Sequence, residues 1–246
     1  MLGVLAFGDS ITNGGGELQW GVALQSWALW TARALGLPYT PYASDGASVR
    51  TVLDEQLPAF SARSATPDGP YDLGCLYIGT NDVRRFDWDP FAFERGLGEA
   101  LAFVAARSQR TLTPTIPLDL GRPRAGAKVR DANAIIERCA SATGALVVDL
   151  AGFRGRRVLM ADHVHPTAFG QIVIAERALD VLARDGLRAT ARPWELISYE
   201  TTRWGRLRGD ASYLYRHAKV SAGAAGSLLR LRLARRAPAR PRGAGG

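Results

Sequence analysis

Two short sequences, far apart in the chain, carry the side-chain types of a nucleophilic catalyst. Ser10 follows a short apolar run, and Asp162 lies three residues before His165. A neutral hydroxyl is a poor nucleophile and needs a base, which in turn needs a carboxylate to orient it. One turn of loop could bring Asp162 to Nδ1 of His165 and leave Nε2 for Ser10. The spacing favours a Ser-His-Asp arrangement, although a helix N-cap at Ser10 and a surface-loop histidine would explain the same residues.

Two further residues could donate hydrogen bonds to a reacting carbonyl oxygen. Asn81 stands in Gly79-Thr80-Asn81-Asp82 after an apolar run, and its side-chain amide is a donor. Gly46 follows another apolar run, and its backbone could come close to a substrate because glycine lacks a Cβ. The tetrahedral intermediate of acyl transfer needs such preorganised N–H groups. Taken singly, each of the two residues is explained equally well by a turn.

The segments that must position these residues alternate between strands and helices. Apolar runs of strand type occupy residues 2–7, 39–43, 73–78, 110–114 and 145–150. Helical patterns occupy residues 20–35, 51–62, 90–107, 126–143 and 166–184. We expect Asp89 to cap the third helix, Gly144 to end the fourth and Pro166 to open the last. Because the strands are apolar on both faces, the alternation predicts a five-stranded parallel sheet with helices on each side.

The candidate reactive residues follow the predicted strands. Gly8-Asp9-Ser10, Asp45-Gly46 and the Asn81 turn each come just after an apolar run, and Asp162 and His165 lie in another loop before the last helix. In open parallel sheets, ligands bind at the carboxyl ends of the strands. We therefore expect these loops to meet at one edge of the sheet.

Together the motifs resemble the SGNH/GDSL superfamily of lipases and acylhydrolases, across residues 2 to about 185. They occur in the family's order: Phe7-Gly8-Asp9-Ser10-Ile11-Thr12, Gly46, Gly79-Thr80-Asn81-Asp82 and Asp162-x-x-His165-Pro166. Thr12 stands where many members have serine, and the second motif consists only of Ser44-Asp45-Gly46-Ala47. The Gly-x-Ser-x-Gly elbow of α/β-hydrolases is absent from the sequence.

The resemblance implies a flavodoxin-like three-layer α/β/α sandwich that hydrolyses acyl esters through an acyl-enzyme, with no cofactor and no metal. It implies Ser10 as nucleophile, His165 as base and Asp162 as the partner of His165. It also implies an oxyanion hole made by the backbone N–H groups of Ser10 and Gly46 and the amide of Asn81. An acyltransferase of the same fold, which passes the acyl group to a sugar or lipid hydroxyl, would use the same residues.

Other functions fit the sequence less well. His163 and His165 have a spacing found among metal ligands, so a metallophosphatase with Asp9, Asn81 and both histidines as ligands is an alternative. Such sites usually have more histidines and an Asp-x-His near the N-terminus, where this chain has Asp9-Ser10-Ile11. A non-catalytic binding module is a third possibility, which the complete Ser, His, Asp and Asn set argues against.

Aromatic and basic residues near the motifs suggest walls for a substrate pocket. Arg84, Phe86 and Trp88 follow the Asn81 turn directly, and we expect them to line an acyl or leaving-group pocket. Trp20, Trp27 and Trp30 share one face of the first predicted helix, which favours packing in the core.

The composition divides the chain into a domain, residues 1–188, and a basic extension, residues 189–246. Residues 190–246 contain 12 Lys and Arg but three acidic residues, whereas the rest of the chain is nearly neutral. We expect the extension to be partly helical with a disordered end. Residues 227–236 form a basic amphipathic stretch that could contact an anionic membrane or an acidic partner. No nucleic-acid motif is present, and the sequence does not indicate an oligomeric state.

The cysteines and the N-terminus indicate a cellular compartment. Cys75 and Cys139 are isolated, with neither metal-ligand spacing nor a disulfide framework. The N-terminal segment lacks the basic region and the small-residue cleavage site of a signal peptide. We therefore expect a cytoplasmic protein whose partner is a small acyl ester.

Overall fold

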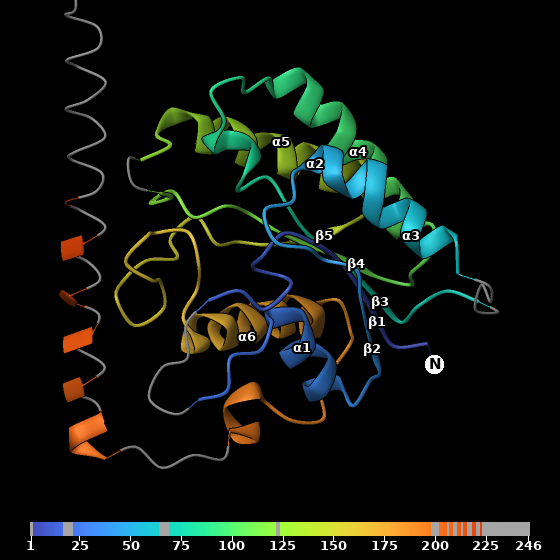
Figure 1. The fold of residues 1–246 in the computed structure, drawn as a ribbon. Helices are drawn as coiled ribbons and strands as arrows, with labels where there is room; N and C mark the ends of the chain where they lie inside the picture. Colours follow the sequence, from blue (N-terminus) through green and yellow to red (C-terminus); the bar gives the residue numbers. More distant parts are fainter. Residues whose placement is uncertain are drawn as a thin grey trace, which may run out of the picture.

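The computed structural model describes residues 2–16, 22–63, 69–121 and 124–197, and scattered positions between 202 and 222. Its centre is a sheet of five parallel strands in the order β2-β1-β3-β4-β5 (Figure 1). The strands are β1 (Val4–Gly8), β2 (Tyr39–Pro41), β3 (Leu73–Tyr77), β4 (Thr111–Pro114) and β5 (Leu146–Val148). Each strand runs parallel to its neighbours in the sheet, as the apolar runs predict.

Helices cover both faces of the sheet and complete three layers (Figure 1). On one face lie α1 (Trp27–Leu35) and α6 (Ala168–Arg184), which pack against each other. On the other face lie α2 (Val49–Thr51), the π-helical segment η1 (Val52–Gln56), α3 (Leu57–Ser61), α4 (Pro90–Ala105) and α5 (Ala127–Thr143). Two single turns, η2 (Asp82–Arg84) and η3 (Pro193–Leu196), complete the elements. The predicted α/β/α sandwich is confirmed.

The core fills the space between the layers. All five residues of β1 and all five of β3 are buried, which explains why these strands read as continuous apolar runs. Phe7 and Phe60 form an aromatic cluster with Tyr42 and Phe103 on one face of the sheet. On the opposite face of the sheet, Trp27 packs against Tyr77 of β3. Both Trp27 and Trp30 are buried in the core, as their helical spacing predicts, whereas Trp20 lies outside the described residues.

Two predicted helix starts are wrong. The first helix begins at Trp27 rather than at residue 20, because the hydroxyl of Ser26 accepts a hydrogen bond from Leu29 N at 3.1 Å and caps the helix there. The last helix begins at Ala168, with Thr167 as its N-cap, rather than at Pro166. Pro166 is extended and forms an isolated bridge with Leu159. The predicted caps Asp89 and Gly144 stand where expected.

The segment after α6 packs on the same body. Thr190 N donates to Ala34 O at 2.9 Å, and the ring of Trp194 stacks on that of Phe169 with 5.7 Å between centroids. Contacts with α1 and α6 therefore continue to about residue 197, beyond the predicted boundary at residue 188. The basic amphipathic stretch, residues 227–236, lies outside the described residues. None of the helices in the described part of the chain has the length and apolar character needed to cross a membrane.

Candidate active site

Ser10 stands two residues beyond the end of β1, in a tight turn. Gly8 closes the strand with a φ of +143°, and a Cβ there would lie 2.3 Å from the backbone oxygen of Tyr77. Only glycine fits this close approach of two strands. The side-chain amide of Gln56 makes two hydrogen bonds with Gly8. Its Oε1 accepts from the N–H of Gly8 at 3.0 Å, and its Nε2 donates to the carbonyl of Gly8 at 2.8 Å. The end of β1 is therefore fixed directly before Ser10.

A second buried amide holds the turn from the other side. Nε2 of Gln171, on α6, donates to the carbonyls of Ile11 and Gly15 at 2.9 and 3.2 Å. Its Oε1 accepts from the backbone N–H of Trp27 at 2.8 Å. Neither Gln56 nor Gln171 was predicted from the sequence. Gln171 stands in an otherwise apolar helical segment, where a buried amide must find backbone partners, whereas Gln56 follows two acidic residues and carries no such signal.

Asp9, directly before Ser10, is a fully buried carboxylate. One of its oxygens accepts a hydrogen bond from the backbone N–H of Ile11 at 2.9 Å. Burial raises the pKa of Asp9 from 3.8 to about 7, and the bond from Ile11 and the nearby His165 oppose this rise only in part. Its side chain points into the protein, while that of Ser10 faces His165.

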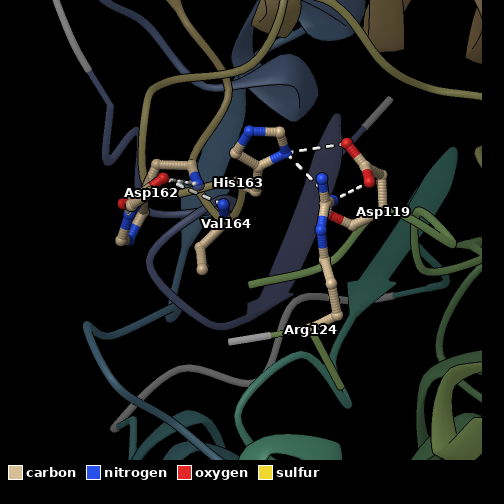
Figure 2. A network of polar contacts seen from close by, with 6 residues as sticks. Asp119, Arg124, Asp162, His163 and Val164 are labelled. Atoms are coloured by element: carbon tan, nitrogen blue, oxygen red, sulfur yellow. Dashed lines mark hydrogen bonds and ion pairs between the residues drawn. The ribbon is translucent and has the colours of Figure 1, made fainter. Parts of the chain in front are cut away.

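The loop before α6 brings a histidine and a carboxylate to Ser10. Oγ of Ser10 lies 3.0 Å from Nε2 of His165, and Nδ1 of His165 lies 2.7 Å from Oδ2 of Asp162. Oδ1 of Asp162 accepts from the backbone N–H groups of Val164 and His165 at 2.9 and 3.1 Å; Figure 2 shows the contact with Val164. The structure thus joins three side chains that are up to 155 residues apart in sequence.

The carboxylate of Asp162 favours the protonated form of the His165 imidazole. The contact with Asp162 raises the pKa of His165 above 6.5, against the opposing effect of burial. For Asp162, burial alone would raise the pKa, but the bonds from His165 and Val164 outweigh it and lower the pKa below 3.8. The carboxylate is therefore ionised at neutral pH and stabilises a protonated imidazole.

The loops after β2 and β3 are tied together beside Ser10. Nδ2 of Asn81 donates to the backbone carbonyl of Ala47 at 2.9 Å. The carboxylate of Asp82 accepts from the N–H of Val49 at 3.1 Å. An amide group carries two N–H bonds, so Asn81 retains one for a further acceptor. Gly46, with a φ of +75°, makes the turn that leads into this contact.

These residues surround one cavity of about 380 Å³. Its lining consists of Ser10, Gly15, Gly16, Asp45, Gly46, Asn81, Met160 and His165. Four sequence-predicted residues, Ser10, Gly46, Asn81 and His165, therefore meet at its wall, and Asp162 contacts His165. All come from loops at the carboxyl ends of the strands or before α6, as expected for a parallel sheet.

The expected pocket walls Arg84, Phe86 and Trp88 are not among the described residues that line this cavity, although the charge of Arg84 acts to lower the pKa of His165. Phe86 is fully exposed. Trp88 packs on Phe93, with 5.0 Å between ring centroids, and lines a separate cavity of about 290 Å³ beside α4. The turn η2 directs the chain from Asn81 toward the start of α4, where Trp88 packs.

His163 does not face the same cavity as His165. Its Nδ1 lies 2.7 Å from Oδ2 of Asp119 and 3.1 Å from Nη1 of Arg124 (Figure 2). The four residues of the metallophosphatase alternative therefore do not converge. Within the described ranges, no group of three or more His, Cys, Asp or Glu side chains is placed to hold one metal ion.

The comparison with family models identifies the chain's relatives. The model of the GDSL-like lipase/acylhydrolase family matches residues 6–172, a range that contains Ser10, Asn81, Asp162 and His165. The chain belongs to this family. On the C-terminal side of the matched range, this GDSL hydrolase also contains the end of α6, the turn η3 and the basic extension. A comparison with curated proteins found no match.

Solved structures share the fold of this GDSL hydrolase. A lipolytic protein of the G-D-S-L family from Veillonella parvula has a TM-score of 0.59 at 24% identity, covering 74% of this chain and 98% of its own. An α/β hydrolase from the metagenome of Lake Arreo gives 0.55 at 24% identity, with 73% and 94% covered. An acetylxylan esterase from Geobacillus stearothermophilus gives 0.55 at 19% identity, with 73% and 93% covered. The structural neighbours thus include esterases.

Proposed function

We propose that this GDSL hydrolase cleaves carboxylic esters through an acyl-enzyme on Ser10, with His165 as general base and Asp162 as the partner of His165. The observation that carries the proposal is the continuous contact from Oγ of Ser10 through His165 to Asp162, at 3.0 and 2.7 Å. These distances lie in the range over which a base can take a proton from a nucleophile.

The first half of the reaction acylates the serine. Nε2 of His165 takes the proton of Ser10 as Oγ forms a bond to the ester carbonyl carbon, and the carbonyl oxygen becomes an oxyanion. The N–H groups of Ser10 and Gly46 and the second N–H of Asn81 are the proposed donors to this oxygen. When the intermediate collapses, the bond between the carbonyl carbon and the alkoxy oxygen breaks. His165 then gives its proton to the leaving alcohol.

The second half frees the enzyme. His165 takes a proton from water as the water oxygen attacks the acyl-enzyme, and a second oxyanion forms in the same place. Collapse breaks the bond to Oγ of Ser10, which recovers the proton from His165, and the carboxylic acid leaves. Asp162 stays ionised throughout and stabilises the imidazolium in both halves.

The lining of the cavity favours a short acyl group. Of the eight lining residues that the structure describes, three are glycines, and Met160 supplies the one long apolar side chain among them. A buried CH₂ group contributes about 0.8 kcal/mol only where apolar surface receives it, and this cavity offers little. An acetylxylan esterase is among the structural neighbours, and an acetyl ester of a polar alcohol fits the same chemistry. The cavity is open to solvent, which supports hydrolysis over acyl transfer.

A fluorophosphonate probe and a series of p-nitrophenyl esters test the proposal. We expect the probe to label wild-type protein at Ser10 and not the Ser10→Ala variant. We expect p-nitrophenyl acetate to be hydrolysed with a higher kcat/KM than the octanoate. Absence of both labelling and hydrolysis in folded wild-type protein would refute the function, whereas a preference for octanoate would refute only the acyl-length argument.

A further inference from the structure

His163 has a backbone conformation that is costly for a residue with a side chain. Its φ is +57°, and it is the one non-glycine residue with a positive φ in the part of the chain that the structure describes. The left-handed region costs an L-residue about 1–2 kcal/mol. Such a conformation persists only where the surrounding contacts hold it. The contacts of His163 therefore indicate what its conformation is for.

The left-handed residue turns the chain between Asp162 and His165. After this turn, the N–H groups of Val164 and His165 both point to Oδ1 of Asp162. Oδ2 is thereby left for the imidazole of His165, at 2.7 Å from Nδ1. The conformation of His163 thus sets how the carboxylate meets the imidazole.

The loop between β4 and α5 holds His163 at two points. The imidazole contacts Asp119 at 2.7 Å, and the backbone carbonyl of His163 accepts from Gly121 N at 2.8 Å. Arg124 forms an ion pair with Asp119 and also reaches the imidazole (Figure 2). A protonated Nδ1 can donate to Asp119, and an unprotonated one can accept from Arg124. The ring therefore has a partner in either tautomer.

We propose that Asp119, His163 and Arg124 form a clamp that positions the turn of Asp162 and His165 against Ser10. Asp119 and His163 are then positioning residues for the reaction, and in this the proposal rests on the proposed function. None of the three lines the cavity at Ser10, so they act through the turn. A displacement of about 1 Å in a reacting group can lower a rate about 10²-fold, which makes a rigid turn valuable.

The variant His163→Gly separates the side-chain contacts from the backbone conformation. Glycine adopts the left-handed region without strain, so the variant keeps the backbone conformation and loses the contacts of the imidazole, including those with Asp119 and Arg124. We expect kcat toward p-nitrophenyl acetate to fall about 10- to 100-fold, with KM changed less than about twofold. His163→Asn, which tolerates the same φ and keeps a donor, should retain more activity than His163→Gly. A wild-type kcat in His163→Gly would overturn the clamp.

A double-mutant cycle tests whether Asp119 acts through His163. We expect Asp119→Ala to lower kcat as His163→Gly does, and the double variant to be no slower than the slower single variant, because both changes break one contact. Independent, multiplying effects would contradict a shared clamp. Asp185→Ala is the matched control, since Asp185 also pairs with an arginine at 2.7 Å and its side chain is similarly exposed. Its kcat should equal that of wild type.

An NMR titration gives a readout that needs no hydrolysis. The chain has three histidines, so their ring signals can be assigned by substitution in the full-length protein. The contact with Asp162 raises the pKa of His165, and loosening the turn in His163→Gly should move this pKa toward 6.5. A merely structural role would lower Tm and leave the titration of His165 unchanged, which would overturn the proposal. If the titration moves but wild-type protein hydrolyses no ester, the clamp stands and the proposed function fails.

Discussion

The side-chain amide of Asn81 donates a hydrogen bond to the backbone carbonyl of Ala47, with 2.9 Å between Nδ2 and the oxygen. This bond joins the loop after β3 to the loop after β2, beside the cavity that Ser10, Gly46 and Asn81 line. One N–H of the amide therefore shapes the cavity, and the other is the proposed donor to the oxyanion. The two roles make different predictions for stability and rate.

Replacing Asn81 with alanine should lower kcat by about 10²–10³-fold and change KM little. The lost donor would act on charge that appears only in the transition state. The variant should also lose about 1–3 kcal/mol of stability, because the carbonyl of Ala47 loses its partner. Melting temperature and kcat, measured on one preparation, separate the effects. A lower melting temperature with wild-type kcat would mean that Asn81 only shapes the loop.

The pH dependence of kcat/KM should report the base. A protonated His165 cannot accept the proton of Ser10, so activity falls as pH drops through its pKa. Asp162 raises this pKa, so we expect the midpoint of the acid limb above pH 6.5. Asp162→Asn should move the midpoint down and lower kcat by about 10⁴-fold, because the imidazole loses its orienting carboxylate. A pH-rate profile of both proteins between pH 5 and about 9 checks this; an unmoved midpoint would contradict the role of Asp162.

Asp9 should make the protein less stable as pH rises. Burial raises the pKa of Asp9 from 3.8 to about 7, so between these values the folded state holds a proton that the unfolded state has released. The free energy of unfolding then falls with increasing pH, by up to about 1.4 kcal/mol per pH unit, and levels off above about pH 7. Asp9→Asn lacks this titration, so its stability relative to wild type should rise from pH 4 to 7.

Urea unfolding of Asp9→Asn and wild type at pH 5 and at pH 8 measures this difference. Asp131→Asn is the control, because Asp131 is exposed on α5 and its carboxylate is solvated in both states. An equal stability difference at the two pH values would mean that Asp9 is ionised in the folded protein throughout this range.

The sequence predicts what depends on local pattern and strand order. Ser10 and His165 are 155 residues apart, yet both could be expected at one edge because parallel strands place their following loops together. The buried strands β1 and β3 were equally clear, since both faces of each are apolar. Helix starts were less clear: the tryptophan spacing extended the first helix to residue 20, although Ser26 caps it locally.

Features that depend on tertiary contacts could not be predicted. The direction of the chain after Asn81 follows from the packing of η2 and α4. Phe86 is therefore exposed and Trp88 packs on Phe93, and neither lines the cavity at Ser10. His163 appeared as a neighbour of His165, but its partner Asp119 comes from a loop 44 residues away. Gln56 carries no motif, and its role follows only from the position of Gly8.

The last prediction concerns Gln171, which holds three backbone groups around Ser10. Its side chain is fully buried and contacts the carbonyls of Ile11 and Gly15 and the N–H of Trp27. Gln171→Met keeps the side-chain length but leaves these groups without a partner. Each buried group so left costs about 1–3 kcal/mol, and partial relaxation would bring the total to about 2–4 kcal/mol.

Urea unfolding of Gln171→Met beside Gln109→Met measures this cost, because Gln109 is an exposed glutamine whose replacement should change stability by less than about 0.5 kcal/mol. At a temperature where both variants are folded, Gln171→Met should also react more slowly with a fluorophosphonate, since the turn that presents Ser10 has lost its support from α6. Equal stability of the two variants would show that Gln171 does not hold the turn. A large loss of stability with wild-type labelling would show that it supports the fold without orienting the serine.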